Sequence, residues 1–253
     1  MARRKKSSAD QTVGVGLTTR NVKKNRSPFL DILRDDIEPL SDNQKTFFDS
    51  YKKGQNIIAC GCAGTGKTFI ALYNALREVL DVNTPYQRIY LVRSLVATRE
   101  IGFLPGDHED KADIYQIPYK SMLRYMFVPD NDAEAEMLYG NIKSQDIIKF
   151  WSTSFLRGTS LDDAIIIVDE FQNLNFHELD SIITRVGKDS RIVFCGDSSQ
   201  SDLQKQNEKN GIVDFMNILR KMPSFDIIEF GIGDIVRSGI VREYLVAKME
   251  SGF

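Results

Sequence analysis

The sequence contains few of the residues on which membrane, disulfide-rich and zinc proteins depend. Its 253 residues include no run of about 18 apolar side chains, the length that a membrane-spanning helix needs. It has only three cysteines and two histidines, and neither histidine has the spacing of a zinc ligand relative to Cys60 and Cys62. These scarcities argue against a membrane protein, a disulfide framework and a structural metal site. The cysteines, which lie in or beside apolar runs, favour buried thiols in a reducing cytoplasm.

The amino terminus also lacks the apolar stretch of a signal peptide, although it begins with a cluster of positive charges. Residues 1–27 carry eight lysines and arginines against one aspartate, whereas the remainder carries 25 against 34 acidic residues. We therefore expect residues 1–27 to form a disordered basic arm on an acidic body. Contact with a polyanion and simple solubilisation are both consistent with such an arm.

The remaining residues, 28–253, are expected to form a single α/β domain. Apolar runs predict strands near residues 56–60, 88–92, 164–169, 191–196 and 225–230, and helical patterns alternate with them. This alternation indicates a mostly parallel sheet with helices on both faces. The stretch from about 107 to 160 is expected to be an excursion from the sheet, because 127–151 is polar and broken. The excursion has aromatic residues such as Tyr119 and Trp151, which fit either a core or a surface that stacks on nucleic-acid bases.

A glycine-rich loop lies between the first predicted strand and a helical pattern. Its pattern, Gly-x-x-x-x-Gly-Lys-Thr, is that of a P-loop, whose backbone amides surround a phosphate at the start of a helix. Lys67 is expected to reach the β- and γ-phosphates of ATP, and the Thr68 hydroxyl to bind Mg²⁺. The predicted nucleotide-binding residues of this loop are Gly61, Cys62, Ala63, Gly64, Thr65, Gly66, Lys67, Thr68 and Phe69.

Gln44 lies upstream of the P-loop, where a side-chain amide can read the edge of the adenine ring. We include it among the candidate nucleotide-binding residues. An ordinary exposed glutamine on a helix fits the same spacing equally well.

Two carboxylates follow the most apolar predicted strand, 164–168, in the manner of a Walker B motif. Hydrolysis of ATP requires one acidic group at the Mg²⁺ ion and a second that polarises the attacking water. We assign Asp169 to the metal and Glu170 to the water. The next strand ends in Gly196–Gln200, where Gln200 can contact the γ-phosphate or the water.

Together these motifs resemble the PhoH family of phosphate-starvation-inducible P-loop ATPases, in the short form often found in bacteriophages. The resemblance runs from about residue 40 to residue 248. The segments that carry it are 61–68, 92–107 (VRSLVATREIGFLPGD), 154–161 (SFLRGTSL), 165–173 (IIIVDEFQN), 184–187 (TRVG), 196–203 (GDSSQSDL) and 234–237 (DIVR).

The resemblance implies a RecA-like core similar to that of superfamily 1 helicases. It also implies Mg²⁺-dependent ATP hydrolysis with RNA or single-stranded DNA as partner, in the cytoplasm, or the host cytoplasm for a phage protein. Two alternatives stay open. The first is a nucleotide-gated binding module with little turnover, and the second is a small-molecule kinase. Glu170 and Gln200 favour hydrolysis over both, because they position water.

One P-loop and no internal repeat indicate a single RecA-like core, whereas superfamily 1 helicases close the ATP site between two. We expect a second protomer to close it through a heterologous interface, in a homo-oligomer that is a hexameric ring by analogy. An arginine would then reach the γ-phosphate from the neighbouring protomer. The candidates are Arg185, expected on the helix after Glu170, Arg237, expected at the start of the last helix, and Arg157 as a weaker third.

Overall fold

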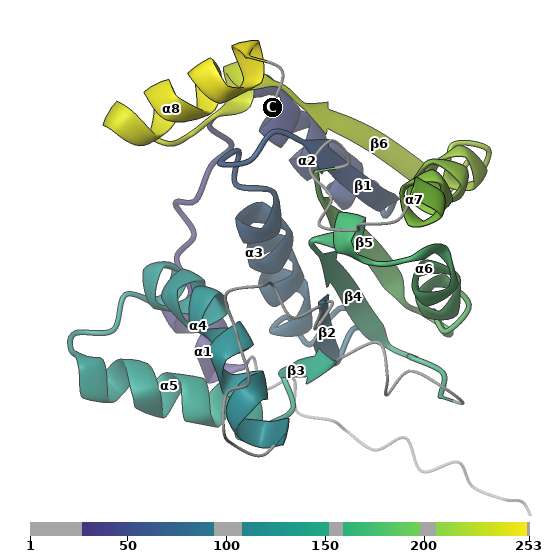
Figure 1. The fold of residues 1–253 in the computed structure, drawn as a ribbon. Coiled ribbons are helices and arrows are strands. Elements are labelled where there is room, and N and C mark those ends of the chain that lie inside the picture. Colours follow the sequence, from purple (N-terminus) through teal and green to yellow (C-terminus); the bar gives the residue numbers. More distant parts are fainter. Residues whose placement is uncertain (1–26, 94–107, 152–158, 198–205, 252–253) are drawn as a thin grey trace, which may run out of the picture.

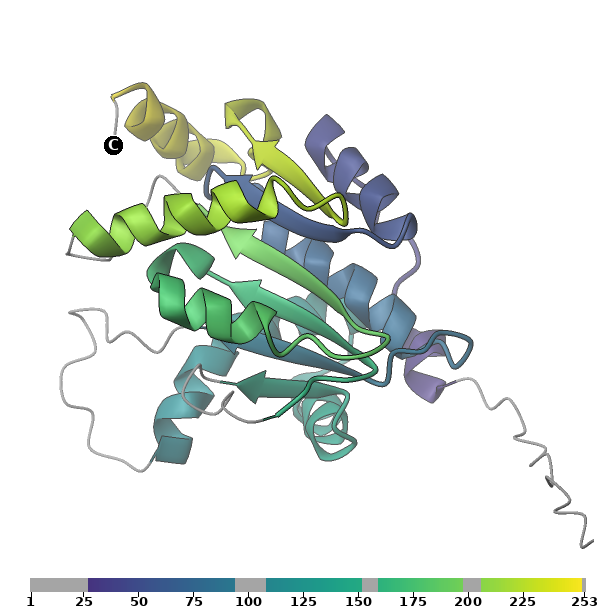
Figure 2. The same ribbon diagram turned by 90° about the vertical axis from the view of Figure 1, so that its right-hand side faces the viewer.

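The computed structural model describes residues 27–93, 108–151, 159–197 and 206–251, and its centre is a parallel β-sheet. The strands are β1 (Asn56–Gly61), β2 (Arg88–Arg93), β3 (Ile148–Trp151), β4 (Ala164–Asp169), β5 (Arg191–Gly196) and β6 (Phe225–Phe230). They lie in the order β3-β2-β4-β5-β1-β6, and every neighbouring pair is parallel. Figure 2 shows all of their arrowheads at one edge of the sheet. The loops that follow the strands therefore meet at that edge.

Helices cover both faces of this sheet, as the sequence predicts. They are α1 (Pro28–Ile32), α2 (Asp42–Lys52), α3 (Lys67–Val79), α4 (His108–Phe127), α5 (Asp132–Ser144), α6 (Phe176–Ile183), α7 (Gln206–Leu219) and α8 (Gly239–Glu250). Alternate strand residues enter two cores: Ile57 and Ala59 pack with α2 and α3, whereas Ile58 and Cys60 pack with α6 and α7. Figure 1 shows α3 and α6 on opposite sides of the sheet. The RecA-like α/β fold class is thus confirmed, with β5 between β1 and β4.

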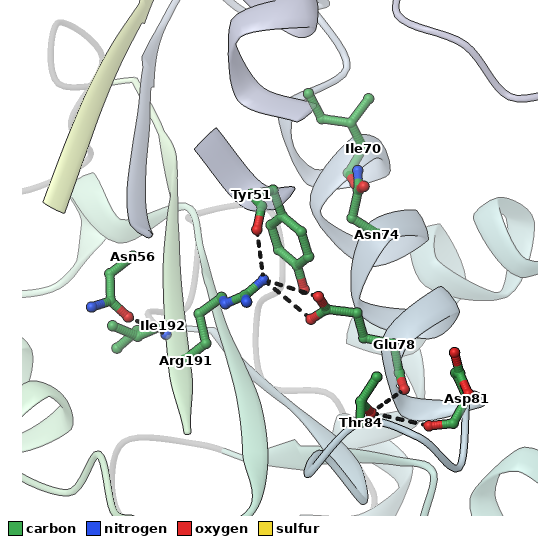
Figure 3. A network of polar contacts seen from close by, with 9 residues as sticks. All are labelled: Tyr51, Asn56, Ile70, Asn74, Glu78, Asp81, Thr84, Arg191 and Ile192. Atoms are coloured by element: carbon green, nitrogen blue, oxygen red, sulfur yellow. Dashed lines mark hydrogen bonds and ion pairs between the residues drawn. The ribbon is translucent and has the colours of Figure 1, made fainter. Parts of the chain in front are cut away.

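Arg191, the first residue of β5, fixes α2 and α3 to the sheet (Figure 3). Its guanidinium donates to the Tyr51 carbonyl oxygen at 3.1 Å and to the two carboxylate oxygens of Glu78 at 3.1 and 3.3 Å. It also lies 4.3 Å from the centroid of the Tyr51 ring. Burial raises the pKa of Glu78, and the charge of Arg191 opposes that effect. These contacts anchor the far end of α3, the helix whose first residues are Lys67 and Thr68.

The stretch 127–151, which is polar and broken in sequence, contains helix α5 and strand β3, so the expected excursion includes a strand of the sheet. Asn131 caps α5 by accepting a hydrogen bond from the Glu134 amide at 2.9 Å. Leu138, Tyr139 and Ile142 then bury one side of the helix. β3 has only four residues and pairs with β2 at the end of the strand order. A capping residue and three apolar side chains were enough to order a segment that looks polar overall.

The basic arm, the membrane-span criterion and the cysteines can each be compared with the structure. Residues 1–26 of the predicted basic arm lie outside the described residues, so its disorder stays a prediction. In the part of the chain that the structure describes, no helix combines the length and the apolar character of a membrane span. Cys60, Cys62 and Cys195 are buried free thiols, as predicted.

Candidate nucleotide-binding site

The loop between β1 and α3 adopts a backbone that only glycine accommodates well. Gly61, Gly64 and Gly66 have φ angles of 112°, 75° and 79°. A Cβ atom on Gly61 would also lie 2.2 Å from the carbonyl oxygen of Phe230 in the neighbouring strand β6. Gly66 is the N-cap of α3, so the unpaired amides of that helix's first turn border the loop. The sequence-predicted P-loop therefore has the fold of an anion-binding site.

The ammonium group of Lys67 lies inside this loop. It donates to the carbonyl oxygens of Gly61 and Cys62 at 2.7 and 2.6 Å, and it lies 3.3 Å from the Thr65 hydroxyl. Burial lowers the pKa of Lys67. The positive charge is thus held among neutral carbonyl groups, with no carboxylate among its hydrogen-bond partners in the described residues. Such a charge is well placed to bind an anion at the loop.

A hydroxyl and a carboxylate meet beside the loop in the arrangement that a nucleotide-bound Mg²⁺ needs. The Thr68 Oγ1 atom donates to Asp169 Oδ1 at 2.6 Å, joining the start of α3 to the end of β4. Among the residues that the structure describes, no three His, Cys, Asp or Glu side chains form a metal cluster. Mg²⁺ in nucleotide sites takes most of its ligands from phosphate and water, so this hydroxyl–carboxylate pair of hard oxygen ligands fits the ion.

Glu170 lies next to this pair and is held by Gln172. Its backbone is in the left-handed region, with a φ of 51°, and the Gln172 Nε2 atom donates to its Oε2 at 2.5 Å. The Gln172 Oε1 atom accepts from the Asp197 amide at 3.0 Å, which joins the ends of β4 and β5. Burial and the neighbouring charge of Asp169 raise the pKa of Glu170. A raised pKa suits a carboxylate that takes a proton from water.

These groups open into one cavity of about 860 Å³. The P-loop, Asp169 and Glu170 line it, together with side chains from α3, from α4 and from the chain before α2. These further lining residues include the apolar or aromatic Ile37, Leu40, Phe69, Met122 and Tyr125 and the charged Arg34, Asp36 and Glu38. The Phe69 and Tyr125 rings pack edge to face with their centroids 5.6 Å apart. The Arg34 guanidinium lies 4.7 Å from the centroid of the Tyr125 ring. Away from the P-loop, the lining of the cavity therefore combines apolar and charged side chains.

Gln44 is not exposed, and both ends of its amide have partners within the protein. It is 2% exposed, its Nε2 atom donates to the Thr65 carbonyl oxygen at 2.9 Å, and its Oε1 atom accepts from the Leu40 amide at 2.8 Å. The side chain thus braces the P-loop while lining the cavity. Recognition of adenine by Gln44 stays a prediction, and it would require these partners to be exchanged.

The two leading arginine candidates lie at different edges of the sheet. Arg237 lines the cavity of its own protomer, and its Cγ atom would lie 3.0 Å from a Cβ on Gly64. It precedes α8 rather than beginning it, because that helix starts at Gly239. Arg185 is not on a helix either, since α6 ends at Ile183. The turn with Arg185 pairs with Leu161 and precedes β5, so it lies at the edge where the strands begin.

Gln200 and Arg157, together with the GFLPG segment, lie outside the described residues. Of the aromatic residues in the excursion, Tyr119 is buried, and the Trp151 ring packs 4.8 Å from that of Tyr90. The core interpretation therefore holds for these two. Tyr125 is 55% exposed, but it lines the cavity that contains the P-loop.

Three side chains at this site were not among the predicted site residues. Gln172 follows Glu170 closely, and its segment carries the family resemblance, so a local signal existed. Arg93 ends β2 opposite Asp169 in the sheet register, and that register is not visible in the sequence. Tyr119 donates to Asp169 Oδ2 at 2.6 Å from 50 positions away in the chain, and no local pattern marks it.

Comparisons with known proteins agree with these motifs. The family model described as "PhoH: PhoH-like protein" matches residues 36–248. A PhoH-like protein of Mycobacterium leprae is 31% identical over 85% of this chain and 59% of its own length. Protein PhoH of Escherichia coli is 27% identical over 82% of this chain and 56% of its own. The chain thus spans somewhat more than half the length of these relatives.

Solved structures with a similar shape include the large terminase of a thermophilic bacteriophage in complex with ADP. It has a TM-score of 0.47 and 12% identity, and the match covers 83% of this chain and 50% of that one. The Pyrococcus furiosus Hef helicase domain has a TM-score of 0.45 and 13% identity, with 80% and 41% covered. These likenesses are low, and the fold of this chain is established by its own strand order.

Proposed function

The chain belongs to the family of PhoH-like proteins, and from that premise we propose that it is an ATPase that uses Mg²⁺. The observation that carries the proposal is the meeting of Thr68, Asp169 and Glu170 in the cavity that contains the P-loop. A hydroxyl–carboxylate pair for the metal and a second carboxylate beside it are the groups that hydrolysis of a γ-phosphate needs.

Each group has a distinct role in this proposal. The P-loop amides and Lys67 bind the phosphates, and Thr68 with Asp169 holds the Mg²⁺. The bound Mg²⁺ would supply positive charge to the phosphate oxygens as negative charge develops on them. Glu170 orients the attacking water and accepts its proton, while Gln172 keeps the Glu170 carboxylate in place. Arg237 adds a positive charge to the same cavity.

We assign the nucleobase to the part of the cavity that Phe69 and Tyr125 line. With the phosphates at the P-loop, an aromatic face there would stack on the base. Contacts of this kind hold any base and discriminate little among them. Selectivity for adenine would have to come from Gln44, the candidate for reading the base edge.

We also propose that hydrolysis is coupled to RNA or single-stranded DNA. This part is supported by the family resemblance and by the basic charge of residues 1–27. A nucleotide-gated binding module is the alternative, and the complete set of Lys67, Thr68, Asp169 and Glu170 argues against it. A small-molecule kinase is less well supported, because a kinase must exclude the water that Glu170 is placed to activate.

The central test separates binding from chemistry. Glu170→Gln should keep affinity for Mg²⁺–ATP while turnover falls by roughly two or more orders of magnitude, the size of general-base effects. Lys67→Ala should lose affinity and turnover together, because the P-loop loses its fixed positive charge. Titration of a fluorescent ATP analogue and a phosphate-release assay measure the two quantities. Near wild-type hydrolysis by Glu170→Gln would show that the base has been misassigned.

The coupling to nucleic acid needs its own measurement. We expect single-stranded RNA or DNA to raise the ATPase rate, and deletion of residues 1–27 to weaken the salt dependence of nucleic-acid binding. Phosphate release should be measured alone and with single-stranded RNA, single-stranded DNA and duplexes. An ATPase rate that is unchanged by all of them would leave ATP hydrolysis standing and reject the coupling.

A further inference from the structure

The carboxylate of Asp169 is held from two sides by hydroxyl groups. Its Oδ1 atom accepts from Thr68, and its Oδ2 atom accepts from the hydroxyl of Tyr119 at 2.6 Å. The two donors come from different helices, α3 and α4, so together they fix the rotation of the carboxylate about its Cβ–Cγ bond. Tyr119 is 1% exposed, and water does not compete for this contact.

We propose that Tyr119 is a positioning residue for the Mg²⁺–nucleotide: its hydroxyl holds Asp169 in the orientation that serves the metal. This inference rests on the proposed function, because it concerns the same site. Groups that hydrogen-bond to a metal's ligands orient them and change metal affinity, although they do not touch the ion. Thr68 cannot fill this role alone, because a single donor leaves the other carboxylate oxygen free to turn away.

Arg93 places a positive charge beside this hydrogen bond. Its guanidinium lies close to the Tyr119 hydroxyl and to the charges of Asp169 and Glu170. The Tyr119 hydroxyl donates its proton to Asp169, because an ionised carboxylate can only accept. The positive charge of Arg93 also offsets part of the repulsion between the two carboxylates.

The ring of Tyr119 is fixed by its surroundings in α4. It packs 5.4 Å from the ring of Phe150 in β3. One turn earlier on the same helix, Gln116 accepts a hydrogen bond from Tyr139 of α5. The hydroxyl is thus presented by a helix that is braced on the edge strand and on its neighbour. A support of this kind is what holding a ligand to within a fraction of an ångström requires.

A plainer interpretation is that Tyr119 is a core tyrosine whose hydroxyl needs some partner. Tyr73 offers a matched comparison within the chain. Its side chain is fully buried, and its hydroxyl donates to the backbone carbonyl oxygen of Arg34 at 3.0 Å. Replacing either tyrosine by phenylalanine removes one buried hydroxyl and keeps the ring. Only at Tyr119 does that hydroxyl contact the metal-binding carboxylate.

The experiment compares Tyr119→Phe, Tyr73→Phe and the wild type in binding rather than in turnover. Calorimetry gives the affinity for ADP with Mg²⁺ and with EDTA, and electron paramagnetic resonance gives Mn²⁺ affinity in the presence of ADP. For Tyr119→Phe we expect metal affinity to fall by about tenfold, the lower end for such supporting contacts. ADP affinity in EDTA should not change. Tyr73→Phe should match the wild type in metal affinity and in ADP affinity. Thermal melting checks that both variants fold.

The outcomes separate this inference from the proposed function. If wild-type protein binds ADP more tightly with Mg²⁺ and Tyr119→Phe shows the same gain and the same Mn²⁺ affinity, the positioning role is wrong and the ATPase proposal stands. Equal losses of metal affinity in Tyr119→Phe and Tyr73→Phe would also overturn the positioning role, since such losses would reflect packing alone. If wild-type protein shows no metal-dependent gain, both the inference and the proposed function fail.

Discussion

Gly196 shows how closely single residues are packed behind the two carboxylates. A Cβ atom at this position would lie 2.2 Å from Gln172 Oε1 and 2.8 Å from Phe171 Cδ1. Gln172 is the residue that holds Glu170 and accepts from the Asp197 amide. The last residue of β5 must therefore be glycine for the Gln172 amide to bridge the two strand ends.

We predict that Gly196→Ala displaces Gln172 and lowers the ATPase rate by about tenfold to a hundredfold, as expected for small misplacements of a catalytic group. Nucleotide affinity should stay close to that of the wild type. Gly140→Ala is the control, because a Cβ there meets no atom within 4 Å in helix α5. That change should stabilise the protein by about 0.5–1 kcal/mol and leave turnover alone. An undiminished rate in Gly196→Ala would contradict the role given to Gln172.

At the scale of elements, the segment after β6 is hydrogen-bonded to the P-loop. The Val236 amide donates to the Gly64 carbonyl oxygen at 3.1 Å. Asp234 holds the segment in place by accepting from Asn43 of α2 and from the Gly231 amide, both at 2.8 Å. Burial alone would raise the pKa of Asp234, but these hydrogen bonds and one from Ser41 outweigh it, so the pKa is lowered.

The lowered pKa predicts how the stability of an Asp234→Asn variant should depend on pH. Because the folded protein binds this proton less readily than the unfolded chain, the Asp234 carboxylate stabilises the fold above the ordinary aspartate pKa, about 4. The benefit is lost as the pH falls through the lower pKa of the folded state. We expect wild-type protein to be about 1 kcal/mol more stable than Asp234→Asn at pH 7. Urea unfolding should show that gap closing below about pH 4; a gap independent of pH would contradict the assignment.

The elements differ in how far the sequence predicts them. The five strands expected from apolar runs are present, because a strand buried on both faces is continuously apolar. The P-loop and Asp169–Glu170 were also predictable, since their chemistry depends on short, fixed spacings. Helix α5 and strand β3 were not, because their few buried residues matter only through packing on α4 and β2. Tyr119 was missed for the same reason: its role depends on a contact between distant segments.

At the scale of the whole molecule, the two arginines suggest how protomers would share a site. Arg237 lies in its own cavity, so its charge acts within one protomer. Arg185 lies at the edge where the strands begin, whereas the nucleotide cavity lies where they end. It could reach a nucleotide only in a second copy, through a heterologous head-to-tail contact, and such contacts form a ring when the rotation closes. The positions of the two arginines therefore favour different roles for them.

We predict that Arg185 acts in trans and Arg237 in cis, and mixing inactive protomers can distinguish the two. In a ring, an Arg185→Ala protomer keeps Glu170 and can receive Arg185 from a Glu170→Gln neighbour. In an equal mixture, about one quarter of the interfaces should therefore have both groups and be active. Each variant alone is expected to hydrolyse ATP about a thousandfold more slowly than the wild type. A mixture of Arg237→Ala with Glu170→Gln should recover no ATPase activity, because each site still lacks a group of its own protomer.

The measurement is phosphate release by the mixtures, together with the mass of the protein in solution and the dependence of specific activity on dilution. A monomer whose specific activity is constant on dilution would reject sharing altogether, and recovery with Arg237→Ala alone would exchange the two assignments.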